Sequence, residues 1–532
     1  MQTDSRYALT ERGLMASVGL DASRSHRRDG VLLMTLYVLL QGILLFHGLA
    51  ACGLFLYGMN CYVLLFLHRR VWSKVLQHEA TVQQAWQART PRYPRVTVQL
   101  PLYNESYVIQ RLVEAVVHLH YPRAQLEIQL LDDSTDETTA LAEQLVEGYR
   151  PLGFAITLQH RHHRHGYKAG ALAEGLQHAT GEFIAIFDAD FVPAPDFLLG
   201  TLPFFQDPAV AMVQTRWGHL NRAYSRLTLA QSFGIDGHFW VEQTARCGAG
   251  WFMNFNGSGG VWRRQAIEDA GGWQADTLTE DLDLSYRAQL RGWRLQFVPH
   301  VVCPAELPVQ MSGVKSQQHR WAKGSIQTAK KLLPRVLQAD VPRLTKCQAV
   351  FHLTNYLVHP LMLCMALTTP WLLQVAPGIF RHAHVLTIVG TVCATVGPTS
   401  LYLYAQRHLY PDWTHRLRSF PYLLIFGTGI ALSNTKAILE ALCNVRGTFV
   451  RTPKFRIEHP SDTWVGKRYR AAFPWLSLGE LCLAVYSSYG VYLAVHQGAY
   501  LLIPFLLLYT LGFAAVAGLS LYESFQGVVR HT

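Results

Sequence analysis

Short apolar runs alternate with amphipathic stretches between residue 94 and about residue 310. Five runs have the apolar, β-branched character of strands: Val96 to Leu100, Glu127 to Leu131, Ile156 to Gln159, Phe183 to Phe187 and Ala211 to Thr215. Between them, stretches such as 106 to 119 and 138 to 149 carry apolar residues at helical spacing. The alternation predicts an α/β domain with a mostly parallel sheet, in which ligands gather at the carboxyl ends of the strands.

A long uncharged stretch precedes this domain. No Asp, Glu, Lys or Arg occurs from Val31 to Leu67, and a helix of that length spans ~55 Å against ~30 Å of hydrocarbon. Either one long helix protrudes from the bilayer or two helices cross it. Because Arg69 and Arg70 follow and favour the cytosol, we expect one crossing at about 31 to 56 and an interfacial part up to residue 67. Residues 1 to 30 form a polar segment without the features of a cleaved signal peptide.

Five further apolar segments follow the α/β domain, near residues 349 to 375, 384 to 405, 420 to 443, 474 to 495 and 499 to 520. Segment 420 to 443 contains Asn434, Lys436 and Glu440, so we interpret it as interfacial or re-entrant. Basic residues flank this segment on both sides and favour the cytosol: Arg416, Arg418, Arg446, Arg451, Lys454 and Arg456. The region 349 to 522 then crosses the membrane four times.

The catalytic region and the membrane region meet at a basic, amphipathic stretch. We place the α/β domain at residues 94 to 330 and expect amphipathic interfacial helices at 321 to 348. Composition supports contact with lipid, because only 16 % of the 532 residues are charged, against about 25 % in soluble proteins. The net charge of +11 suits an anionic bilayer face or phosphorylated substrates and does not choose between them. None of the nine cysteines forms a CxxC pair, so neither a disulfide framework nor a zinc site is expected.

Acidic residues follow two of the predicted strands. One strand ends in Asp132 and Asp133, and another is followed by Asp188-Ala189-Asp190. Alternate residues of an extended chain point the same way, so Asp188 and Asp190 can share one hard cation, such as Mg²⁺ or Mn²⁺, with a bound diphosphate. Taken alone, such acids also cap the helix or turn that follows.

A third acidic cluster, Thr279-Glu280-Asp281, lies further along the chain. Attaching an alcohol to an activated sugar requires a carboxylate that takes the proton of the hydroxyl, and we assign Asp281 to this role. The alternative is structural: Thr279 as a helix N-cap, with acidic residues in the first turn complementing the helix dipole.

The segment Gln317-Gln318-His319-Arg320-Trp321 completes the set of motifs. Arg320 can offer a forked donor to a phosphate, and Trp321 can present an aromatic face to a sugar ring. Both residues also suit an amphipathic helix that lies at the membrane interface, and the two roles are compatible.

The motifs that contain Asp133, Asp188 and Asp190, Asp281, and Arg320 together resemble the D, DxD, TED, QxxRW signature of processive family 2 glycosyltransferases, the cellulose, chitin and hyaluronan synthase group. Longer strings are similar to plant cellulose synthase-like mannan and glucan synthases and their bacterial relatives: Gln214-Thr215-Arg216-Trp217, Phe255 to Arg263, and Ala270-Gly271-Gly272-Trp273. The resemblance covers residues 94 to 330 strongly and the membrane layout loosely. It implies a nucleotide-diphospho-sugar transferase domain of GT-A type, inserted between transmembrane helices.

The resemblance also implies roles for individual residues. An inverting transfer would use a nucleoside diphosphate sugar, with Mg²⁺ or Mn²⁺ at Asp188 and Asp190. The implied donor-binding residues are Pro101, Tyr103, Asn104, Glu105, Asp132, Asp133, Lys168, Asp188 and Arg320. The implied acceptor-binding residues are Asn256, Gly257, Ser258, Gln317 and Trp321, and the catalytic residues are Asp281 and Glu280.

Two features near Lys168 complicate the resemblance. The family motif often has Asn after Leu, whereas Leu172 is followed here by Ala173, so that hydrogen bond is absent. The run from His160 to His165 consists only of His and Arg, and we expect a basic loop beside a diphosphate rather than a metal site.

We therefore expect a multi-pass integral membrane protein, in the bacterial inner membrane, with a cytosolic catalytic domain. It would polymerise a β-linked, β-1,4 polysaccharide from UDP-glucose or GDP-mannose. Its partners would be the nucleotide-sugar donor, the growing glycan acceptor and the lipid bilayer, not nucleic acid, and the sequence leaves the oligomeric state open. The alternatives are a single-transfer enzyme that makes a glycolipid, similar to ceramide glucosyltransferases, and a transporter that binds nucleotide sugars without turnover.

Overall fold

A seven-stranded sheet forms the centre of the catalytic region. The fold comes from a computed structural model, which describes all residues except 1–7, 89–92, 377–383, 446–450, 468–473 and 529–532. The strands are β1 (Val96–Leu102), β2 (Leu126–Asp132), β3 (Ala155–His160), β4 (Phe183–Ile186), β5 (Val210–His219), β6 (Gly260–Arg263) and β7 (Arg294–Ala305). Their order is β3-β2-β1-β4-β6-β5-β7, and only β6 runs antiparallel to its neighbours among these strands. The structure confirms the predicted mostly parallel sheet.

The five strands predicted from apolar runs are all present, and two more were missed. β6 has only four residues and begins at Gly260, which gives no alternating pattern. β7 contains Pro299 and Pro304, and its register with β5 shifts between Thr215 and Arg216. Prolines and an irregular register weaken the period-two signal from which strands are predicted.

Helices cover both faces of the sheet. They are α2 (Ile109–Val117), α3 (Thr138–Tyr149), α4 (Tyr167–His178), α5 (Phe197–Thr201), α6 (Arg226–Gly237), η4 (His238–Gln243), α7 (Thr244–Gly248), α8 (Arg264–Asp269) and α9 (Glu280–Leu290), with short 3-10 turns η1 (Arg123–Gln125), η2 (Arg150–Leu152) and η3 (Leu202–Gln206). Two apolar clusters lie on the two faces, one around Leu100, Ile128 and Phe187 and the other around Met212 and Trp262. They hold the strands rigidly, so that the loops at the strand ends are positioned for a binding site.

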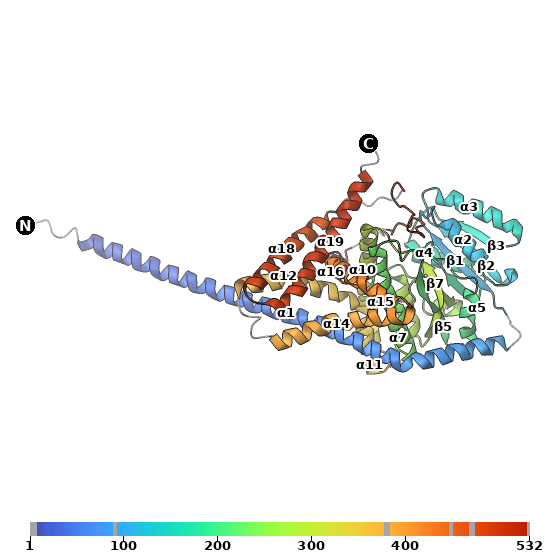
Figure 1. Cartoon of the computed structure of the whole chain (residues 1–532), viewed down its shortest axis with the longest axis horizontal. Coiled ribbons are helices and arrows are strands. Elements are labelled where there is room, and N and C mark those ends of the chain that lie inside the picture. The colour runs from blue at the N-terminus through green and yellow to red at the C-terminus, as the bar shows by residue number, and fades with distance from the viewer. Residues whose placement is uncertain (1–7, 89–92, 377–383, 446–450, 468–473, 529–532) are drawn as a thin grey trace, which may run out of the picture.

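The remaining helices form an elongated bundle beside the sheet domain (Figure 1). They are α1 (Ala8–Gln87), α10 (Met311–Gln338), α11 (Arg343–Leu353), α12 (Val358–Val375), α14 (His384–Leu409), α15 (Trp413–Arg416), α16 (Phe420–Gly429), α17 (Ala431–Leu442), α18 (Leu476–His496) and α19 (Ile503–Val528), with turns η5 (Asn355–Leu357), η6 (Leu417–Ser419) and η7 (Tyr500–Leu502). Within the described ranges, five spans are long and apolar enough to cross a membrane: Tyr37–Gln87, Asn355–Val375, Trp413–Leu442, Leu476–His496 and Tyr500–Gln526.

The sequence left open whether the first apolar stretch forms one long helix or two, and the structure shows one. α1 is a single unbroken helix, and its N-terminal half projects away from the rest of the molecule while its C-terminal half runs along the sheet domain (Figure 1). It begins inside the segment 1 to 30 that was expected to be polar, of which residues 1–7 lie outside the described part. The segment 420 to 443 is divided at Ile430 into α16 and α17, and its position in the membrane stays a prediction.

α10 joins the sheet domain to the membrane region. It packs against α9 on one side and α17 on the other. At Gly324 the approach to α9 is so close that a Cβ atom would lie 2.8 Å from the backbone nitrogen of Thr279. Because no side chain fits there, the helix that carries Arg320 is held directly against the turn that carries Asp281.

Candidate active site

Lys168 lies at the centre of the residues that follow the strand ends. Its Nζ is 2.5 Å from a carboxylate oxygen of Asp188 and donates to the carbonyl of Gly257 at 2.8 Å. The hydroxyl of Ser258 accepts from the backbone N–H of Asp188 at 2.9 Å. The start of α4, the end of β4 and the 254–259 loop are thereby joined.

Asp281 and Glu280 open helix α9 and face the same group. A Cβ atom at Gly257, where φ is +83°, would lie 2.9 Å from Oδ2 of Asp281, so the loop passes directly over this carboxylate. The capping alternative for Thr279 is not observed, because its hydroxyl makes no N-cap bond and lies 3.2 Å from the hydroxyl of Thr328 on α10. The hydroxyl of Thr279 therefore does not cap α9, but Glu280 and Asp281 do lie in its first turn, as the structural alternative also expected.

Burial, together with the neighbouring Glu280, raises the pKa of Asp281 to about 7, while Lys168 opposes the shift. Burial also raises the pKa of Glu280, again against the attraction of Lys168. Lys168 keeps its proton, because the acids outweigh the effect of burial and raise its pKa. A carboxylate with a pKa near the working pH is suited to accept a proton during a reaction.

Arg320 approaches the cluster from α10. Its guanidinium donates to the hydroxyl of Thr452 at 2.9 Å, and the carboxylates of Asp188, Glu280 and Asp190 act on it electrostatically. Burial lowers the pKa of Arg320 to about 10, which leaves it cationic at neutral pH. A buried cation beside three acids is placed to receive a diphosphate.

Gln317 and Trp321 are on the same helix as Arg320, one turn before it and one residue after it, and both are half-buried. Asn256 is also half-buried and precedes the loop residue that contacts Asp281. Their roles in acceptor binding stay predictions.

The pair Asp188 and Asp190 fits a divalent cation. Both carboxylates act electrostatically on Arg320 and on Glu105, so they border one pocket. Each already attracts a cationic group: Lys168 lies on Asp188, and Nζ of Lys454 is 2.5 Å from Asp190. Oxygen donors of this kind suit Mg²⁺ or Mn²⁺. No group of three His, Cys, Asp or Glu side chains in the described residues could hold a metal, so a diphosphate would have to complete the coordination.

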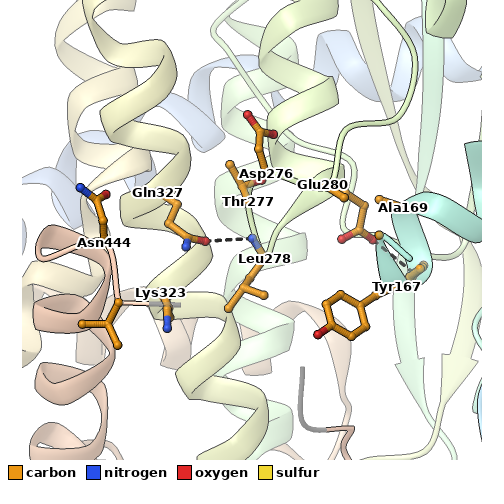
Figure 2. Close-up of a pocket in the computed structure, with 13 residues that line it drawn as sticks. Tyr167, Ala169, Asp276, Thr277, Leu278, Glu280, Lys323, Gln327 and Asn444 are labelled. Atoms are coloured by element: carbon orange, nitrogen blue, oxygen red, sulfur yellow. Dashed lines mark hydrogen bonds and ion pairs between the residues drawn. The ribbon is translucent and has the colours of Figure 1, made fainter. Parts of the chain in front are cut away.

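A cavity of about 530 Å³ adjoins Lys168 and Glu280. Lys323 and Gln327 on α10 form its opposite wall, with Asn444 at one edge (Figure 2). The cavity therefore lies between the cluster and α10, next to the residues that follow α17.

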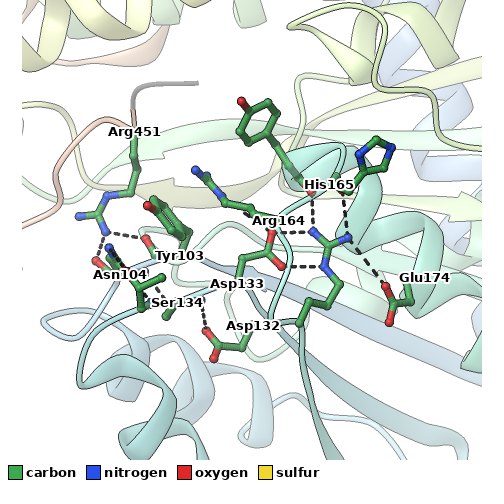
Figure 3. Close-up of polar contacts among 12 residues, drawn as sticks. Tyr103, Asn104, Asp132, Asp133, Ser134, Arg164, His165, Glu174 and Arg451 are labelled. Atoms are coloured by element: carbon green, nitrogen blue, oxygen red, sulfur yellow. Dashed lines mark hydrogen bonds and ion pairs between the residues drawn. The ribbon is translucent and has the colours of Figure 1, made fainter. Parts of the chain in front are cut away.

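The nucleotide end of the predicted site lies after β1 and β2 (Figure 3). Asn104 has a positive φ of 55°, and its side-chain oxygen accepts from the backbone N–H of Thr135 at 2.8 Å. Its own backbone N–H donates to Ser134 at 2.8 Å. These bonds fix the turn that carries Tyr103 and Glu105, and burial raises the pKa of Glu105 to about 7. Pro101 lies in β1 and positions this turn.

Asp133 is held by a forked ion pair. Nε and Nη2 of Arg161 each lie 2.6 Å from one of its carboxylate oxygens. The guanidinium carbon of Arg164 lies 3.3 Å from the ring centre of Tyr103. The basic loop therefore contacts Asp133 and Tyr103, and its expected place beside a diphosphate stays a prediction.

Asp132 is fully buried and accepts hydrogen bonds from the Ser134 backbone, from Thr139 at 2.6 Å and from His160 at 2.7 Å. All of these contacts are internal. A role of Asp132 in donor binding would act through the loop that it braces, not by direct contact.

The loop after α17 was missed as part of the site. Arg451 donates to the carbonyl oxygens of Tyr103 and Asn104, and Lys454 contacts Asp190. In the sequence this basic run indicated only membrane orientation. Its 264-residue separation from Asp190 left no local signal of the contact.

Comparison with known proteins agrees with the fold. The family model described as "Glycosyltransferase like family 2" matches residues 94–324. Glucomannan 4-beta-mannosyltransferase 7 of Arabidopsis thaliana is 36% identical over 312 residues, 57% of this chain and 56% of that protein. Probable glucomannan 4-beta-mannosyltransferase 15 of the same plant is 34% identical over 359 residues, 65% of this chain and 67% of that protein. The sheet and its helices form the predicted GT-A type fold, and the chain is an integral membrane protein.

Glucomannan 4-beta-mannosyltransferase 1 of Cyamopsis tetragonoloba is 40% identical over 49% of this chain and 51% of that protein. The chain therefore spans only about half the length of this relative and of the Arabidopsis mannosyltransferase 7, of which it matches 56%. A solved mannosyltransferase, PcManGT from Pyrobaculum calidifontis in complex with GDP-Man and Mn2+, is 21% identical. It covers 73% of this chain and 99% of its own, with a TM-score of 0.48, too low to support an argument.

Proposed function

Because this chain belongs to the family 2 glycosyltransferases, we propose that it is an inverting, processive synthase that extends a β-linked polysaccharide from a nucleoside diphosphate sugar. Mannose is the first candidate sugar and β-1,4 the first candidate linkage, because the relatives are named 4-beta-mannosyltransferases. UDP-glucose and GDP-mannose are the two donors to compare.

The observation that carries the proposal is the position and pKa of Asp281. Its carboxyl group titrates at about 7 and lies under Gly257, in the same cluster as Lys168 and Glu280. A carboxylate there takes the proton of an acceptor hydroxyl as that oxygen attacks the anomeric carbon. The diphosphate leaves from the opposite face, so a single displacement inverts the configuration and gives a β bond.

Lys168 and Arg320 supply positive charge for the departing diphosphate, at the side of the cluster formed by Asp188. A divalent ion held by Asp188 and Asp190 would add Lewis-acid stabilisation of the same leaving group. The turn at Tyr103 and Asn104, with the forked pair at Asp133, is the proposed site for the base and ribose.

We propose that the donor reaches the site from the cytosol and that the membrane helices receive the glycan product. The bacterial inner membrane remains the proposed location, although the named relatives are plant proteins.

The test is a product assay on the purified full-length protein in detergent. UDP-glucose and GDP-mannose are supplied with Mg²⁺ or Mn²⁺, released nucleoside diphosphate is measured, and the product is collected on a filter. We expect a polymer that an endo-β-glycanase digests. A chloroform-soluble glycolipid would instead indicate the single-transfer alternative, and label uptake into sealed vesicles without nucleoside diphosphate release would indicate a transporter.

A further inference from the structure

One helical run next to the acceptor loop contains a turn of unusual geometry. The chain is helical from Arg226 to Gly248, but residues His238–Gln243 form a π-helix between α6 and α7. Such turns insert one extra residue and are found mostly at functional sites, because they redirect side chains at some cost in stability. Two of the redirected side chains, His238 and Gln243, contact Asn256.

The orientation of these polar groups follows from one backbone carbonyl. The side-chain nitrogen of Gln243 lies 2.7 Å from the carbonyl oxygen of Asn254, which can only accept a hydrogen bond. The same nitrogen lies 2.7 Å from the side-chain oxygen of Asn256 and donates to it. The amide nitrogen of Asn256 is therefore the atom that faces Nε2 of His238, at 3.0 Å.

The tautomer of His238 is fixed in the same way. Since Nε2 accepts from Asn256, the proton of the neutral ring is on Nδ1, which donates to Oε2 of Glu242 at 3.1 Å. Burial alone would raise the pKa of Glu242, but the contact with His238 and the charge of Arg246 hold it below its ordinary value. The result is a directed relay from Gln243 through Asn256 and His238 to an ionised Glu242.

The relay ends in a partly exposed space next to helices of the membrane region. The side chains of His238 and Glu242 are 27% and 26% exposed, although their neighbours Phe239 and Trp240 are buried. The space adjoins α14, because a Cβ atom at Gly237 would lie 2.5 Å from the ring of Tyr402. Glu242 also acts electrostatically on Tyr356 and Cys61, from η5 and α1.

The relay leaves one donor and one acceptor for a ligand. In the part of the chain that the structure describes, Oε1 of Glu242 has no hydrogen-bond partner, and neither does the second N–H of Asn256. A donor and an acceptor on neighbouring side chains match adjacent hydroxyl groups of a pyranose ring, each of which both donates and accepts.

We infer that Asn256, His238 and Glu242 form an acceptor subsite that binds the hydroxyl groups of the second sugar of the growing glycan. Asn256 precedes the glycine that covers Asp281, while Glu242 lies further toward the membrane helices. The reacting sugar therefore lies at Asp281 and the next sugar at the relay. This inference rests on the proposed function, because it requires a glycan acceptor.

The test is the KM for the acceptor in Glu242→Gln. The glutamine oxygen still accepts from His238, so the relay keeps its direction, but the ligand-facing oxygen is replaced by an N–H donor. We expect a roughly 10- to 100-fold higher KM for β-linked oligosaccharide acceptors, with unchanged donor KM and unchanged melting temperature. A monosaccharide acceptor, which does not reach the subsite, should show no difference.

His238→Ala, which breaks the relay, should raise the same KM. Glu79→Gln is the matched control, because Glu79 accepts from His300 at 2.8 Å in a histidine–glutamate pair away from the acceptor loop. An unchanged oligosaccharide KM in Glu242→Gln, or an equal increase with the monosaccharide, would overturn the subsite. If the wild-type protein extends no β-linked oligosaccharide from any donor, the proposed function fails as well, and that outcome is distinguished because the wild type is measured first.

Discussion

The acids at the two ends of the site have different cationic partners. The nucleotide end contains Asp133, and the transfer end contains Lys168 and the acids around it. At the nucleotide end Asp133 has its own forked partner, Arg161, at 2.6 Å. At the transfer end three acids, Asp188, Glu280 and Asp281, lie around the ammonium group of Lys168, and Arg320 is a second cation that acts on Asp188 and Glu280. Asp133 therefore has a cation of its own, whereas three carboxylates share two cations at the transfer end.

This difference indicates that the nucleotide end recognises the donor by its shape, whereas the transfer end carries out the proton transfer. A forked arginine–carboxylate pair fixes the position of both groups and needs no further ligand, so it suits recognition of a nucleotide by form. Burial and the neighbouring charge of Glu280 raise the pKa of Asp281 to about 7, so this carboxylate holds its proton more tightly than an ordinary aspartate. An additional cation or a proton would reduce the repulsion among the carboxylates at the transfer end. We therefore expect substitutions at the transfer end to lower kcat and substitutions at the nucleotide end to raise the donor KM.

The largest effect is expected for Asp281→Asn. The amide keeps the shape of the side chain but cannot take a proton, so kcat should fall roughly 10²- to 10⁴-fold. Binding of nucleoside diphosphate, measured by calorimetry, should be retained. Asp269→Asn is the control, because Asp269 is an acid on the sheet domain that accepts from Trp293 and lies outside the cluster.

The pH profile of the wild-type enzyme sharpens the same prediction. The base works when deprotonated, so kcat should be constant above pH 7 and should fall by about tenfold per pH unit below the pKa of Asp281, about 7. The residual activity of Asp281→Asn should lack this slope. If Asp281→Asn instead kept the wild-type rate and the wild-type profile, the proton transfer would belong to another group.

The second prediction concerns Gly257, in the middle of the loop formed by residues 254–259. Alanine there would place a Cβ atom 2.9 Å from Asp281 and 3.4 Å from Lys168, and we expect a loss of about 100-fold in kcat through misplacement of these groups. Gly153→Ala is the matched control: its φ of +87° carries the same backbone strain, but nothing lies within 4 Å of the added atom. Equal losses in both variants would show that strain and not the contact with Asp281 is responsible.

The sequence predicted the acids of both ends correctly as neighbours of strand ends, because a parallel sheet brings the carboxyl ends of its strands together. Asp133 and Asp188 each follow an apolar run that became a strand. It also predicted a base at Asp281, although the local pattern from Thr279 to Asp281, taken alone, favoured helix capping, and the role of Asp281 stays a prediction. In the structure the hydroxyl of Thr279 contacts Thr328 on α10 and does not cap the helix, while the acids do lie in the first turn of α9.

The partners of these acids were much harder to predict. Lys454 reaches Asp190 from a loop 264 residues away, and no local pattern encodes a contact of that range. The π-helical turn at His238–Gln243 was also invisible, because one inserted residue does not disturb the composition of an otherwise helical segment. The cationic partners of acids at a site often come from such long-range contacts. The sequence therefore located the acids without showing which cations lie beside them.

The smallest effect is expected at the nucleotide end, for Arg161→Lys. Lysine keeps the charge but loses the fork, so Asp133 should no longer be held by two bonds and the donor KM should rise about tenfold. kcat at saturating donor should stay within a factor of about two, because the groups around Lys168 are unaffected. Arg264→Lys is the control, a half-buried arginine whose Nε lies 2.8 Å from a carboxylate oxygen of Glu268 outside the site, and it should change neither constant. A fall in kcat with an unchanged donor KM in Arg161→Lys would mean that the two ends are not separate in function, and the comparison between them would fail.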